Sequence, residues 1–142
     1  MATHATRSAR RAFTLVELIV IIVVLAILSG VAIPKYIDYT ANAKSSVAKG
    51  SVGAVRAAIS QFYLNSAMNG AAAFPTLVQM QTLGTVMREA LPNNPYNSSN
   101  VIAAATWAAV PPTAGANGWN FDATAGRFWA NSNTAGIGEN AW

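Results

Sequence analysis

The chain has no cysteine and a single histidine, and only 10% of its 142 residues are charged. Without cysteine, neither disulfides nor thiolate metal sites can stabilise the fold, so it must depend on packing. His4 lies in a short segment before a long apolar run, and a mature chain that has lost this segment has no histidine. A Ser-His-Asp triad, a Cys-His pair and a histidine-ligated zinc site are then excluded. The sequence therefore predicts a protein that is not an enzyme.

Carboxylates are also scarce and form no catalytic pattern. Four of the five are scattered along the chain, namely Asp38, Glu89, Asp122 and Glu139. They lack the pairing that acid–base or glycosidase chemistry needs, so we interpret each as a solvated surface charge. Only two acids, Asp122 and Glu139, follow Glu89. Two carboxylates could contribute to a calcium site, but they are too few to indicate one. We therefore expect no cofactor.

Positive charge is concentrated at the N-terminus. The formal net charge is +4, but three of the nine basic residues precede the apolar run, at Arg7, Arg10 and Arg11. Without the residues before Phe13, six basic side chains face five acidic ones, a balance of +1. This balance is too small to indicate a nucleic-acid partner.

The apolar run covers residues 13–33 and contains one charged residue, Glu17. As a helix it measures about 31 Å, close to the thickness of the hydrocarbon core of a bilayer. The basic residues in the leader, residues 1–12, outweigh the charge that follows the span, so we expect a cytoplasmic N-terminus and an exported remainder. The sequence thus predicts a single-pass membrane protein.

Beyond the span, apolar residues recur at three- and four-residue steps over residues 34–70, which predicts an amphipathic continuation of the helix. Pro34 removes one backbone donor and predicts a kink rather than an end. Asn69-Gly70 is a typical C-terminal signal.

Residues 71–142 read as a connecting region followed by a small head. We expect a short helix over 76–90, because Thr76 after Pro75 is a good N-cap. The segments 118–122 and 127–130 flank a turn and predict a hairpin whose aromatic side chains pack in a core. The predicted fold class is α+β, with a long N-terminal helix packed on a small antiparallel sheet.

Glu17 is the residue that most needs an explanation. A carboxylate in hydrocarbon costs several kcal/mol unless a cation pairs with it, and the span contains no lysine or arginine. Cleavage between Ala12 and Phe13 would create a free α-amino group, and the amine of a staggered neighbour could then pair with Glu17. The alternative is that Glu17 lies solvated in the headgroup region and has no function.

The residues from Arg11 to Val20, Arg-Ala-Phe-Thr-Leu-Val-Glu-Leu-Ile-Val, resemble the cleavage and N-methylation motif of type IV prepilins and of the pseudopilins of type II secretion systems. The resemblance implies that a prepilin peptidase cuts between Ala12 and Phe13 and methylates the amine of Phe13. It also implies that Glu17 acts in assembly. Pro34 falls where the long helix of that family usually carries a proline.

The same resemblance implies a homo-oligomeric filament. The subunit would first reside in the inner membrane with its head in the periplasm, and inner-membrane assembly machinery would then build an extracytoplasmic filament. The chain departs from the family pattern in having Ala12 instead of glycine before the cut and in lacking the C-terminal disulfide loop of many type IV pilins. The sequence does not distinguish a pilus from a secretion pseudopilus or a DNA-uptake fibre.

Two other functions are consistent with parts of the sequence. An exported soluble binding protein would have an ordinary secretory signal, with Gly30-Val-Ala32 as the small-residue cleavage site. That interpretation places Glu17 in the apolar core of a signal, where an acid is unfavourable. An anchored enzyme is disfavoured by the missing catalytic residues.

Overall fold

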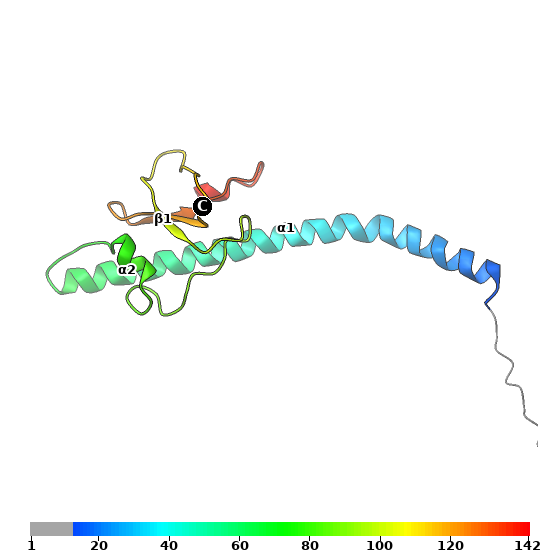
Figure 1. Ribbon diagram of the computed structural model, residues 1–142, viewed down its shortest axis with the longest axis horizontal. Coiled ribbons are helices and arrows are strands. Elements are labelled where there is room, and N and C mark those ends of the chain that lie inside the picture. The colour runs from blue at the N-terminus through cyan, green and yellow to red at the C-terminus, as the bar shows by residue number, and fades with distance from the viewer. Residues whose placement is uncertain (1–12) are drawn as a thin grey trace, which may run out of the picture. The chain divides into compact units, whose positions relative to one another are not determined.

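The computed structural model of the protein describes residues 13–142, so the leader, including Ala12 of the predicted cleavage junction, lies outside the described residues. The chain divides into two compact units, an N-terminal unit that ends at Thr40 and a head that comprises Ala41–Trp142. Helix α1, Leu15–Met68, contributes to both units (Figure 1). The other elements all belong to the head: α2 (Leu77–Gln81), β1 (Ile102–Ala104), β2 (Trp119–Asp122), β3 (Arg127–Ala130) and the 3-10 helix η1 (Glu139–Ala141).

Helix α1 ends where the sequence predicts. Its last helical residue is Met68, and Gly70 takes a left-handed conformation with φ of 84°. The Ala71 amide donates to the Ser66 carbonyl at 3.1 Å and the Gly70 amide to the Ala67 carbonyl at 3.0 Å. This pair of bonds is a Schellman motif, which satisfies carbonyls that the helix itself leaves free. Pro34 lies inside α1, as predicted, and the kink there stays a prediction.

The core of the head lies between the second half of α1 and the sheet (Figure 1). Val52, Val55 and Ile59 form the buried face of the helix, at the spacing that the amphipathic pattern predicts. Opposite them, β2 and β3 supply Trp119 and Phe128, whose rings stack with centroids 5.4 Å apart. The predicted α+β fold class, with a long helix packed on a small sheet, is confirmed.

The sheet has three strands in the order β1-β2-β3. Strands β2 and β3 form the predicted antiparallel hairpin, in which Asp122 pairs with Arg127 next to the turn. Strand β1 runs parallel to β2, so the sheet is mixed and not wholly antiparallel as expected. The physical reason is the length of the connection. Residues 105–118 are long enough to return the chain to the end of the sheet where β1 begins, so β2 can run in the same direction as β1, whereas a tight hairpin enforces antiparallel pairing.

Helix α2 is much shorter than predicted. Thr76 is its N-cap and forms a capping box with Gln79, as its position before the helix suggested. The helix nevertheless ends at Gln81, not near residue 90, because Thr82 is extended and Gly84 has φ of 83°. The chain then continues as irregular structure through residues 84–92 beside α1.

Asp122 and Glu139 are buried, so the prediction that they are solvated surface charges was wrong. Asp122 accepts hydrogen bonds from the backbone amides of Trp107, Thr124 and Ala125 at 2.8, 2.9 and 3.1 Å. The bond from Trp107, followed by those from the turn, holds the pKa of Asp122 below its ordinary value despite burial. Burial alone raises the pKa of Glu139, but hydrogen bonds led by the Thr134 hydroxyl outweigh it and leave the pKa lowered.

A network of asparagine amides holds the loops of the head without disulfides. Asn131 lies at its centre, where its side chain accepts from the Ala114 amide at 2.8 Å and donates to the Asn117 carbonyl at 2.7 Å. Asn120 donates to the Asn131 side chain and to the Pro112 carbonyl, each at 3.0 Å. Side chains that both donate and accept can thus fasten a loop that carries few apolar residues of its own.

Candidate assembly site at the start of α1

The N-terminus of α1 is built around Thr14 and Glu17. The Glu17 Oε2 atom accepts from the Thr14 backbone amide at 2.8 Å and from the Thr14 hydroxyl at 3.0 Å. In return the Thr14 hydroxyl oxygen accepts from the Glu17 amide at 3.2 Å. These reciprocal bonds are a capping box, with Thr14 as N-cap and Glu17 as the third residue of the helix.

The capping role of Thr14 was not predicted, although its signal is present in the sequence. Thr14-Leu-Val-Glu17 directly before an apolar run is the Thr-x-x-Glu pattern of a capping box. The box satisfies two of the backbone donors that the first turn of a helix leaves without partners. A carboxylate in the first turn also interacts favourably with the helix dipole. Glu17 therefore has a role within its own chain that the charge argument alone did not reveal.

Only one oxygen of Glu17 takes part in the box. Within residues 13–142 both bonds to the carboxylate end on Oε2, and Oε1 accepts none. A carboxylate offers about four lone-pair sites, so Oε1 remains able to accept from a group outside the chain. Phe13, directly before Thr14, is 80% exposed. The arrangement thus places a free carboxylate oxygen near the residue where the motif predicts a new N-terminus.

The apolar run after Glu17 has no packing partner in its own unit. Every residue from Phe13 to Thr40 is exposed, including all the leucines, isoleucines and valines. Helix α1 is long and apolar enough to cross a membrane, by length and composition, and none of the apolar window is buried. Such a surface requires hydrocarbon or other apolar helices around it.

The predicted site residues occupy different parts of α1. The structure brings Glu17 together with Thr14, and places Phe13 immediately before them. Pro34 lies in the same helix but several turns further along. Among residues 13–142, no three His, Cys, Asp or Glu side chains gather as a metal site would require.

Residues 7–33 match the family described as the prokaryotic N-terminal methylation motif. The match includes the basic residues of the leader, the Ala12-Phe13 junction, the capping box and the apolar run up to Ile33. Comparisons with curated proteins and with solved structures gave no match. The chain therefore carries the prepilin-type cleavage and methylation motif, which is typical of type IV pilins and pseudopilins.

Proposed function

We propose that the protein is a structural subunit of a type IV pilin-like filament and polymerises through the first half of α1. The observation that carries the proposal is the completely exposed apolar run within the methylation motif, over residues 13–33, with Glu17 as its only charge. A helix of this kind is stable in a bilayer. When subunits assemble, identical helices can replace the lipid around it.

Processing would prepare the subunit for this exchange. A prepilin peptidase would cut between Ala12 and Phe13, which leaves a cationic amine at Phe13 that the same class of enzyme methylates. The cut would also remove all three leader arginines, which hold the N-terminus at the cytoplasmic face. The head would be periplasmic before assembly, and inner-membrane machinery would draw subunits into an extracytoplasmic fibre.

Glu17 would select the correct neighbour during assembly. Its Oε2 atom stays in the capping box with Thr14, while the free Oε1 accepts from the amine of an adjacent subunit. The pairing removes two uncompensated charges from an apolar bundle at once, whereas a misplaced subunit would leave both buried and unpaired. The role of the carboxylate is thus to set the register between subunits.

Mass spectrometry of the mature N-terminus, together with electron microscopy of the cell surface, tests the proposal. We expect a chain that begins at methylated Phe13 and is present in filaments. A chain that begins at Ile33 would instead identify the exported binding protein, and an intact leader beside an active prepilin peptidase would contradict processing at Ala12-Phe13.

A further inference from the structure

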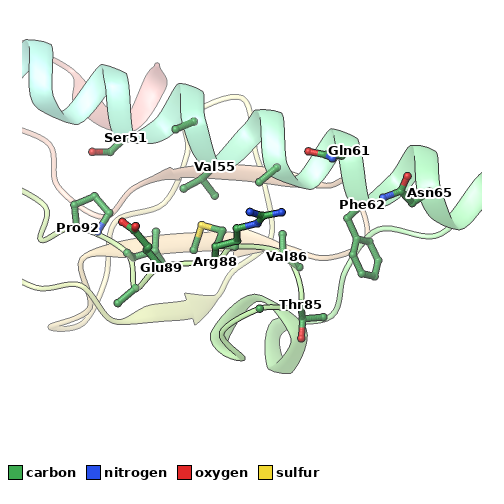
Figure 2. A pocket seen from close by; sticks show the side chains of 16 residues that line it. Ser51, Val55, Gln61, Phe62, Asn65, Thr85, Val86, Arg88, Glu89 and Pro92 are labelled. Atoms are coloured by element: carbon green, nitrogen blue, oxygen red, sulfur yellow. The ribbon is translucent and has the colours of Figure 1, made fainter.

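A groove of about 550 Å³ crosses the head between α1 and residues 84–92. Figure 2 shows the helix as one wall and the irregular segment as the other. Small side chains such as Ala54 and Ala58 line the helix side, while Val86, Met87 and Leu91 contribute apolar surface opposite. A groove with small residues on one wall can admit a helix at close range.

Two charged side chains of opposite sign line this groove. Arg88 and Glu89 are exposed, and both reach into the space between their segment and α1 (Figure 2). Within residues 13–142 neither side chain forms a hydrogen bond or an ion pair with the rest of the chain. The groove therefore presents a cation and an anion side by side with no partner of their own.

The other acids of the chain leave only one candidate partner for Arg88 in a second copy. The sequence has five acidic residues, of which Glu17 belongs to the capping box, and Asp122 and Glu139 are buried and hydrogen-bonded. Glu89 lies in the groove itself. Asp38 is therefore the one remaining exposed acid.

Asp38 lies in a segment of α1 that lacks cover of its own. Just beyond the predicted span, Tyr36, Ile37 and Tyr39 are 70%, 61% and 67% exposed, although hydrocarbon would no longer surround them. Lys35 lies three residues before Asp38, so the two charges share one face of the helix. The segment thus carries the same pair of opposite charges as the groove, next to exposed apolar side chains.

We propose that the groove receives residues 34–40 of a second copy, with Arg88 facing Asp38 and Glu89 facing Lys35 of that copy. The inference rests on the proposed filament and names the head contact that accompanies packing of the apolar helices. The two surfaces differ and belong to every subunit, so each contact leaves one groove and one segment free. Heterologous contacts of this kind build an open helical assembly when the rotation does not close a ring.

Charge reversal tests the ionic part of the proposal in the full-length chain. Arg88→Asp and Asp38→Arg should each reduce filament yield by about fivefold or more, since even one exposed ion pair contributes up to about 1 kcal/mol per contact and reversal adds repulsion. The double variant should restore most of the yield, which loss of folding in either single variant would not do. Lys44→Asp is the matched control, an exposed cation outside the groove, and should form filaments normally.

The absence of cysteine allows a direct test of proximity. Filaments of a variant with Asp38→Cys and Arg88→Cys should give a ladder of disulfide-linked oligomers on mild oxidation, while Asp38→Cys combined with Val110→Cys should not. Normal filaments that give no ladder, and that tolerate each charge reversal, would overturn the groove contact and leave the filament proposal intact. A wild-type chain that is processed but never polymerises would instead contradict the filament proposal.

Discussion

Glu17 has one role within its own chain and a second, proposed role between subunits. One is local, because the first turn of α1 has backbone donors without partners, and the capping box with Thr14 satisfies two of them. The other is electrostatic, because an ionised carboxylate surrounded by apolar helices needs a cation. Substitution by glutamine can distinguish the two roles, since glutamine can take the place of glutamate in a capping box but carries no charge.

We expect Glu17→Gln to insert in the membrane normally and to lose filaments as completely as Glu17→Ala. Gln keeps the bonds to Thr14 but leaves the amine of the neighbour without its counter-charge, and that cost is several kcal/mol per subunit. Quantifying filaments and membrane-resident subunit for both variants checks the prediction. Filaments from Glu17→Gln but not from Glu17→Ala would assign the residue to helix capping alone, and Thr14→Ser serves as a control that preserves the box.

Asp122 makes the stability of the head depend on pH in the acid range. Its pKa is lowered in the folded state, chiefly by the Trp107 amide, so folding stabilises the ionised form. The contribution is complete above the ordinary carboxylate pKa of about 4 and is lost as pH falls through the lower folded value. Glu139, whose pKa is also lowered, adds a loss in the same direction.

Thermal unfolding at a series of pH values should therefore show the melting temperature of the head falling below about pH 4. Asp122→Asn should lower the free energy of unfolding by about 1–3 kcal/mol at neutral pH, because its one acceptor oxygen cannot serve both the turn and Trp107 and the new NH₂ group only donates. The same substitution should also flatten the dependence of the melting temperature on acid pH. Asp38→Asn, at an exposed position, is the control, and an equally flattened profile there would exclude Asp122 as the cause.

Among the elements, one side chain of α1 bonds to both β3 and the C-terminal segment. The half-buried Arg56 donates from Nε to the Phe128 carbonyl at 2.9 Å and from its guanidinium to the Trp142 carbonyl. Burial, followed by the nearby Arg127, lowers the pKa of Arg56. A planar guanidinium can bind two carbonyls in fixed directions, which a lysine ammonium on a flexible chain cannot match.

Arg56→Ala should thus destabilise the head by about 1.5–3 kcal/mol, the usual contribution of hydrogen bonds to a charged group. Arg56→Lys should recover only part of this loss, since it supplies one donor in place of a fork. Denaturant unfolding, followed by tryptophan fluorescence, measures both variants. Equal stability of Arg56→Ala and wild type would mean that the two carbonyls find other donors, and Lys44→Ala provides the baseline for losing an exposed cation.

The elements whose signals are local are those that the sequence predicts. The C-terminus of α1 depends on Asn69-Gly70, and the β2–β3 hairpin on its turn, so both were predictable. The parallel pairing of β1 depends on how residues 105–118 return, which no local pattern encodes. The same holds for Asp122, whose burial follows from a contact with Trp107 that lies 15 residues away in the chain. Thr14 could have been found, because its capping pattern is contiguous.

At the scale of the whole molecule, the chain combines two units that need different surroundings. The N-terminal unit has no buried residue among those described, whereas the head has a core in which the helix, the sheet and α2 all take part. All residues of that core lie between Val52 and Ala130. Removal of the span therefore deletes no residue of that core.

A fragment that begins at Lys35 should therefore be soluble, folded and monomeric without detergent, whereas the mature chain should need detergent. The fragment keeps both the groove and residues 35–40, but the two exposed ion pairs of the proposed contact contribute only about 0.2–1 kcal/mol each. Association costs at least about 4 kcal/mol in lost translational and rotational freedom, so the groove contact alone cannot hold a dimer at micromolar concentration. Sedimentation and circular dichroism measure the two properties directly. A fragment that unfolds would show that the apolar helix supports the head, and a stable oligomer would show that head contacts can drive assembly without the membrane helix.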